Sequence, residues 1–232
     1  MGLVMAILTV SWHADQVITS ITLVILGQGL TTYIYRQQFS SLTARIVGFE
    51  SWPIPGLSEI PLLGDIFFNH DIMTYLSSVI LLGGWFLLYQ TTWGLKIRAT
   101  GEHPAAADTS GVNVNLTRYS AVLIGAALAG LGGAVLTVAQ LHIFNEGITA
   151  GRGWIAVALV IFARWQPHLA FLGAFLFGIA TALQFRIQAL NLEYVPYEIL
   201  LMLPYLLTIL VLLRSSHKSE APAALGTPYI KE

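Results

Sequence analysis

The residue types that usually do chemistry are present in this sequence, but none is spaced for a catalytic or metal site. The chain has no cysteine, which excludes thiol catalysis, disulfides and cysteine-based metal sites. Histidine occurs at six scattered positions, namely His13, His70, His103, His142, His168 and His217. No pair has the H-x-x-x-H or H-E-x-x-H spacing of a zinc site, and no G-x-x-x-x-G-K-[ST] motif supplies a nucleotide-binding loop. We therefore predict no metal site, no ATP hydrolysis by this chain and no enzyme activity of its own.

A few polar residues remain that could contact a substrate. Gln28 and Gln184 each lie inside a long apolar run. In a membrane helix such an amide is more often a packing hydrogen bond than a solute contact. Asn145, Glu146 and Arg152 lie in a loop, 140–152, that also contains glycines. We expect these five residues to mark a substrate pathway, the alternative for the loop being a solvated turn.

The composition indicates what kind of fold must position these residues. Only 10% of the residues are charged, against about 25% in a soluble domain. Hydrophobic residues make up 56% of the chain, and the mean hydropathy is +0.72. The net charge of −1 gives no reason to expect a nucleic-acid partner. A soluble helical domain could not bury so much apolar surface, so we predict an integral membrane protein.

The spacing of the charges predicts the membrane spans. Four charge-free runs are long enough for a helix to cross the hydrocarbon layer, which takes about 20 residues. They lie between Asp15 and Arg36, between Asp71 and Lys96, between Arg118 and Glu146, and between Arg164 and Arg186. The stretch from Tyr194 to Leu213 predicts a further span, and Gly153–Ala163 predicts a short span or a half-helix. Continuous apolar runs favour helices over a barrel, so we predict an all-α polytopic helical bundle of about six spans.

The two ends of the chain differ from the rest. The first ten residues, MGLVMAILTV, are apolar but too short to span a membrane. We expect an N-terminal partial span, the second half of a helix in an incomplete transmembrane domain over 1–214. A signal-peptide core is the alternative, without the usual basic start and cleavage site. Residues 215–232 are polar and contain prolines, which predicts a disordered tail.

Basic residues predict which loops face the cytoplasm. Segment 94–118 carries Lys96, Arg98 and Arg118, and the chain after Leu213 carries Arg214, Lys218 and Lys231. Cytoplasmic loops are enriched in these residues, so we place both segments, and the C-terminus, inside. The segment 36–71 is dominated by acids and is expected outside, together with loop 140–152.

Small residues recur every four positions in two of the runs. One series is Ala121, Gly125, Ala129 and Gly133; the other is Ala170, Ala174, Gly178 and Ala182. Small side chains let membrane helices approach closely, so both series predict tight helix–helix contacts.

The segment GLKIRATGEHPAAADTSGVNV, Gly94 to Val114, is polar although apolar runs flank it. We expect Gly101 to break one helix, Pro104 to begin a short new one and Gly111 to end it. Alanines give this short helix a smooth side that could fit a groove on a soluble partner. A plain connector is the alternative.

This segment resembles the cytoplasmic loop of ABC importer permeases of the branched-chain amino acid, ribose and nucleoside group. Those loops read approximately G-x-x-x-R-A-x-G-E-N-P-x-A-A-x-x-x-G-I. The matching positions are Gly94, Arg98, Ala99, Gly101, Glu102, Pro104, Ala106, Ala107 and Gly111, with His103 where asparagine is usual. The block Glu146–Pro167 resembles a later span of the family, and Ala14–Thr31 resembles a span of the nucleoside-type members.

The resemblance implies a permease subunit of an ATP-binding-cassette importer in a bacterial or archaeal cytoplasmic (inner) membrane. A separate ATPase subunit would hydrolyse ATP, so this chain itself would bind no cofactor. The further partners implied are a second permease subunit, identical or different, and an extracytoplasmic solute-binding lipoprotein or periplasmic protein. The residues expected to couple to the ATPase are Arg98, Gly101, Glu102, Pro104, Ala105, Ala106 and Gly111.

The block Ala14–Thr31 favours a nucleoside or simple sugar as the solute. Three alternatives stay open: a branched-chain amino acid permease of the same family, an ATP-independent channel or carrier, and a membrane scaffold that transports nothing.

Overall fold

The chain forms two compact units in the computed structural model, Met1–Ala150 with Pro222–Glu232 and Gly151–Ala221. The described residues are 1–39, 46–49, 51–56, 58–60, 68–190, 202–203, 205–207, 209–210, 213 and 221–231. The predicted span Tyr194–Leu213 therefore lies largely outside the described residues, as does the start of the predicted tail, 215–220.

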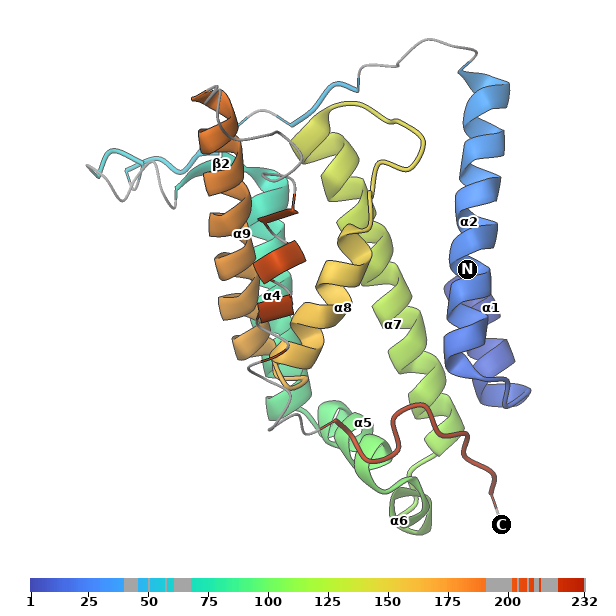
Figure 1. The fold of residues 1–232 in the computed structure, drawn as a ribbon. Helices are drawn as coiled ribbons and strands as arrows, with labels where there is room; N and C mark the ends of the chain where they lie inside the picture. The colour runs from blue at the N-terminus through green and yellow to red at the C-terminus, as the bar shows by residue number, and fades with distance from the viewer. Residues whose placement is uncertain are drawn as a thin grey trace. The chain divides into compact units, whose positions relative to one another are not determined.

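The first unit is built from helices and one short hairpin (Figure 1). Its helices are α1 (Gly2–Ala6) with the π-helical turn η1 (Ile7–Ser11), α2 (Gln16–Gln38), α4 (Ile72–Gln90), α5 (Thr92–Glu102), α6 (Pro104–Thr109) and α7 (Val114–Val135) with the π-helical turn η2 (Leu136–Leu141). The strands β1 (Ser51–Pro53) and β2 (Asn69–Asp71) pair antiparallel, with Trp52 opposite His70. The hairpin is an element that the sequence did not predict.

Polar side chains determine where the long helices of this unit begin. Asp15 accepts hydrogen bonds from the amides of Val17 and Ile18, both at 2.9 Å, at the start of α2. Asp71 caps α4 and Asn113 caps α7 in the same way. Each cap satisfies amide groups that have no partner inside the helix. Three of the long helices therefore begin next to a polar residue that caps them, and α7 begins before Arg118, inside the polar segment.

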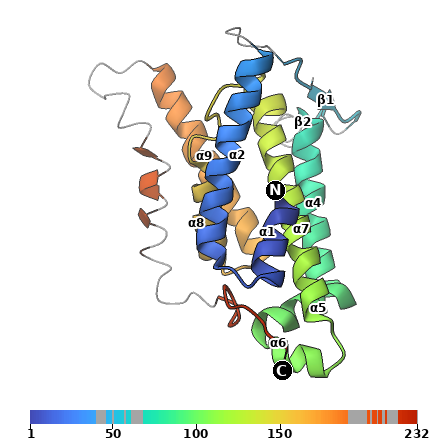
Figure 2. The same ribbon diagram turned by 90° about the vertical axis from the view of Figure 1, so that its right-hand side faces the viewer.

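Helices α1 and α7 pack side by side through small residues (Figure 2). A Cβ added to Gly2 would collide with the Cβ of Ala126. The hydroxyls of Ser11 and Tyr119 are 2.5 Å apart at the end of this contact. The close approach thus depends on Gly2 and Ala126.

The second unit contains α8 (Arg152–Phe162) and α9 (Pro167–Ala189), which pack against each other. A Cβ on Gly173 would lie 3.1 Å from Cγ of Leu159, which shows how closely the two helices approach. Arg164 and Trp165 have φ values of 50° and 56° and form the turn between them. Pro167 is the first residue of α9 after this turn.

The predicted small-residue series do not make these contacts. A Cβ at Gly125, Gly133 or Gly178 would meet no described atom within 4 Å. The actual close approaches use Ala126 and Gly173, which lie beside the predicted series. Among the described residues, the glycines of both series thus make no close approach, and tight contacts along the whole series stay a prediction.

Four described helices are long and apolar enough to cross a membrane: α2, α4, α7 with η2, and α9. They coincide with the four charge-free runs, so the prediction of a helical membrane protein with several spans is confirmed. Gly2–Ser11 and Arg152–Phe162 are shorter apolar helices. Six spans, and a full crossing by α8, stay predictions. Large apolar side chains such as Ile18 (68% exposed) and Leu82 (67% exposed) lie on the helix surfaces, where lipid would cover them.

Candidate functional site

The polar segment between α4 and α7 folds into two consecutive helices, α5 and α6, at the end of the first unit where α7 begins (Figure 1). The hydroxyl of Thr91 accepts a hydrogen bond from the amide of Gly94 at 3.1 Å and caps α5. A Cβ at Gly94 would collide with the carbonyl oxygen of Leu87 and with Cα of Leu88. The sharp corner between α4 and α5 therefore requires glycine at this position.

The short helix α6 forms where the sequence predicts it. Pro104 occupies its first turn, and Gly111, with φ of 85°, follows its end. The amide of Val112 donates to the carbonyl of Ala107 at 3.0 Å and closes the last turn. One detail of the prediction is wrong: Gly101 does not break the preceding helix, because α5 continues to Glu102 and the break falls at His103.

The alanines of α6 differ in exposure. Ala107 is 4% exposed, whereas Ala105 and Ala106 are exposed. Ala106 lines a groove of about 510 Å³ between α5 and α6. The other lining residues are Thr92, Leu95, Lys96, Ala99, Glu102, His103, Ala107, Ser110 and Val112. The smooth side expected from the alanines is therefore one wall of a groove, and Ala105 does not line it.

Arg98 and Glu102 have separate neighbours at this end of the unit. The guanidinium carbon of Arg98 lies 4.9 Å from the centre of the Tyr89 ring, a cation–π distance that ties α5 to α4. The carboxylate of Glu102 accepts a hydrogen bond of 3.4 Å from the amide of Ala223. The seven expected coupling residues thus lie on consecutive turns of one segment, 98–111.

The last residues of the chain bind to this segment, although the sequence predicts disorder for 215–232. The amide of Ala224 donates to the carbonyl of Gly101 at 2.9 Å. Lys231 pairs with Asp108 at 3.1 Å. Residues 223–226 form a turn. The low apolar content of the tail suggested disorder. Most of the contacts seen here use backbone groups of the tail, and composition does not reveal such contacts.

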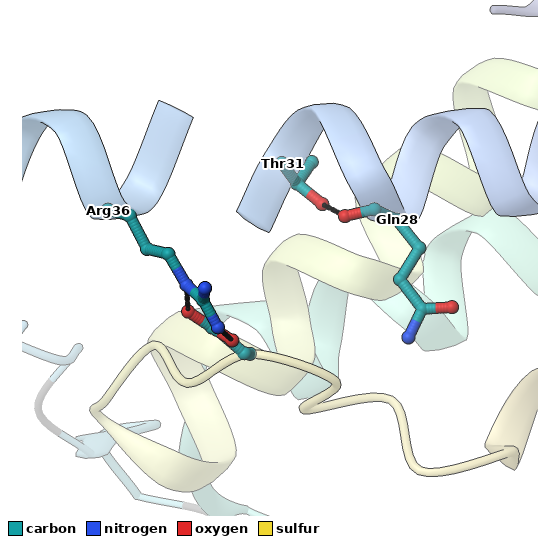
Figure 3. Close-up of polar contacts among 4 residues, drawn as sticks. Gln28, Thr31 and Arg36 are labelled. Atoms are coloured by element: carbon teal, nitrogen blue, oxygen red, sulfur yellow. Dashed lines mark hydrogen bonds and ion pairs between the residues drawn. The ribbon is translucent and has the colours of Figure 1, made fainter. Parts of the chain in front are cut away.

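At the opposite end of the first unit, α2 is linked to the loop after η2. Arg36 donates two hydrogen bonds to Glu146, Nε to Oε1 at 2.6 Å and Nη2 to Oε2 at 2.8 Å (Figure 3). The hydrogen bonds from Arg36 lower the pKa of Glu146 below its ordinary value of 4.5. The carboxylate is therefore held in its charged form. A second link joins the amide of Ile46 to the carbonyl of His142 at 2.9 Å.

The loop that carries Glu146 has an unusual backbone. His142 and Ala150 have φ values of 53° and 42°, and Gly147 and Gly151 also have positive φ. Asn145 is exposed, and its backbone carbonyl accepts a hydrogen bond from the amide of Ile148 at 3.2 Å. The loop is thus a series of turns with its polar side chains at the surface.

The other expected pathway residues have different settings. Gln28 is exposed on α2, and its amide does not join the Arg36–Glu146 pair (Figure 3). Arg152 is the exposed first residue of α8, and Gln184 on α9 is 5% exposed, both in the second unit. Among the pathway residues of the first unit, Glu146 and Asn145 lie together in one loop and Gln28 lies apart.

Sequence reasoning missed the residues that bind the expected ones. Arg36 is 110 positions from Glu146, and Lys231 is 123 positions from Asp108. Opposite charge is the only signal that links them, and it does not select these partners among the others. Across the residues that the structure describes, no group of three histidine, aspartate or glutamate side chains could hold a metal ion.

Comparison with known proteins gives a consistent result along almost the whole chain. The family model for the permease component of branched-chain amino acid transport systems matches residues 1–212. The chain is 40% identical to a putative glucose ABC transporter permease protein, TsgC13, of Haloferax volcanii, over 98% of this chain and 76% of that protein. It is 37% identical to the guanosine ABC transporter permease protein NupQ of Bacillus subtilis, over 99% of this chain and 73% of that protein.

A third relative is the nucleoside ABC transporter permease protein NupC of Lactococcus lactis. It is 36% identical, over 97% of this chain and 72% of its own length. No solved structure matches the fold.

Proposed function

Because the chain belongs to the family of permease components of branched-chain amino acid transport systems, we propose that it is the membrane subunit of an ATP-driven importer for nucleosides or simple sugars. The observation that carries the proposal is similarity over 97–99% of the chain to permeases named for glucose, guanosine and nucleosides. A match of this extent includes both the spans and the polar segment between α4 and α7.

The groove between α5 and α6 supports a role in coupling to a separate ATPase. It combines an exposed alanine with charged residues, Lys96 and Glu102, on a segment outside the long apolar helices. The chain has no phosphate-binding loop, so ATP would be hydrolysed by a separate subunit. A soluble ATPase subunit needs such a surface to bind and move the spans. We assign docking to this groove and hydrolysis of ATP to the partner.

The orientation follows from the lysine and arginine count. The segment 92–113 and the tail 222–231 are in contact, so they belong on the same side. Both carry basic residues, which supports a cytoplasmic position for that side. Arg36 and loop 142–150 then face the outside of the cytoplasmic membrane, where a solute-binding protein would deliver its cargo. The exposed apolar helix faces leave room for a second permease subunit.

The test is reconstitution of this chain with its ATPase and solute-binding protein in liposomes. Guanosine and glucose are the solutes to compare, with leucine as the branched-chain alternative. We expect guanosine or glucose to stimulate ATP hydrolysis and to accumulate only with ATP. Stimulation by leucine alone would identify the amino acid alternative, and flux without ATP would identify a channel or carrier.

A further inference from the structure

The C-terminal segment 222–231, here called the C-terminal strap, crosses three elements of the first unit (Figures 1 and 2). The Ala224 amide binds the Gly101 carbonyl at the end of α5. The Arg118 guanidinium on α7 donates to the Thr227 carbonyl at 2.8 Å. Beyond these, Lys231 binds Asp108 on α6. The strap therefore ties α5, α6 and α7 to one another.

The strap also reaches the connection between η1 and α2. Nε2 of His13 lies 3.1 Å from the carbonyl oxygen of Tyr229, within hydrogen-bond distance. Pro222, Ala224 and Leu225 close one side of a cavity of about 230 Å³ whose remaining lining comes largely from α1, η1, α5 and α7. The strap is thus packed along its length and is not held by one contact alone.

The strap leaves the α5–α6 groove open. None of its described residues lines that groove, although it binds Glu102, which lines the groove, and Asp108, which does not. A segment that blocked docking would have to fill the groove. A segment that holds the groove in place needs only contacts around it, and those are the contacts present.

We propose that the C-terminal strap positions α6 against α7 and the start of α2, so that movement imposed on the groove is passed to the spans. Lys231 and Asp108 are the positioning residues on the strap and on α6. This inference rests on the proposed importer function only for its consequence in transport. The positioning of α6 by the strap can be measured on this chain without any partner.

The partner-free measurement uses a spin label. The chain contains no cysteine, so Thr109→Cys gives a single labelling site at the end of α6. We expect removal of residues 222–232 to make the label markedly more mobile in the purified chain. A spectrum unchanged by the truncation would overturn the proposal, whatever the transported solute is.

The second measurement uses the complete importer in liposomes. Truncation should leave the ATPase bound but reduce the solute moved per ATP about fivefold, as expected for the loss of a modest coupling free energy. Lys231→Asp and Asp108→Lys should each reduce the solute moved per ATP. The double exchange should restore it, and Lys231→Arg, which keeps the charge, should leave it unchanged. Ile230→Ala is the control, because that side chain is 70% exposed between two strap residues that make contacts.

Two results would overturn the proposal at this stage. Full coupling by the truncated chain would show that the strap transmits nothing. Loss of ATPase binding on truncation would show that the strap is part of the docking surface. A wild-type complex without solute-stimulated hydrolysis would instead refute the importer function, and the spin label would still decide the positioning of α6.

Discussion

Replacing Ala106 with glutamate is the sharpest test of the groove between α5 and α6. Ala106 is exposed and lines the groove, so a longer side chain has room in the free chain. The loss of helix propensity from alanine to glutamate is only about 0.4 kcal/mol. We therefore expect the variant to fold with nearly unchanged stability.

Docking of an ATPase should be affected far more strongly than folding. A charge left unpaired in a closed interface costs about 3–5 kcal/mol. Since about 1.4 kcal/mol corresponds to a tenfold change in affinity, the ATPase should bind about 100- to 5,000-fold more weakly. Glu102 lines the same groove and would add like-charge repulsion.

The assay is co-purification with the ATPase, followed by solute-stimulated hydrolysis. Ala106→Gln separates size from charge and should bind better than Ala106→Glu. Ala105→Glu places the same charge on the neighbouring residue, which does not line the groove, and should have a much smaller effect. Equal affinity of the wild type and Ala106→Glu would refute docking in this groove.

Three further predictions concern other parts of the fold. Gly94→Ala should destabilise the chain by about 1–3 kcal/mol, because its Cβ collides with the backbone of Leu87 and Leu88; a thermal midpoint equal to that of the wild type would contradict this reasoning. The stabilisation from a carboxylate of lowered pKa is present above its unfolded pKa and is lost as the pH falls through its folded pKa. The difference in thermal midpoint between the wild type and Glu146→Gln should thus be constant near neutral pH and disappear as the pH falls below 4.5. A difference that persists in strong acid would exclude a stabilising Arg36–Glu146 pair. Asn145→Cys, in a chain otherwise free of cysteine, should react with an impermeant thiol reagent from outside only, and labelling from the cytoplasm alone would reverse the proposed orientation.

Local features of the fold could be predicted from the sequence because their causes are local. The length of each charge-free run predicts a span, and polar residues that suit helix starts, Asp15, Asp71 and Asn113, cap the helices. Pro104 and Gly111 mark α6 because proline suits a first helical turn and glycine tolerates positive φ. These signals extend over a few residues, so no tertiary information is needed.

The contacts between distant segments could not be predicted in this way. The strap binds largely through backbone amides and carbonyls, which every sequence carries. The faces used by Gly2 against α7 and by Gly173 against α8 depend on how the helices are rotated. The two π-helical turns, η1 and η2, could not be predicted from the apolar pattern either, because each continues a helix without a change in composition.

The position of η2 bears on how the two ends of the first unit could communicate. Helix α7 begins beside α6 and the strap, where Arg118 binds Thr227. It ends in η2, which leads through His142 to the loop that Glu146 ties to α2. Single π turns inside helices often occur at functional sites. Helix α7, η2 and the loop residues 142–146 therefore form one continuous stretch of chain between α6 and the Arg36–Glu146 pair.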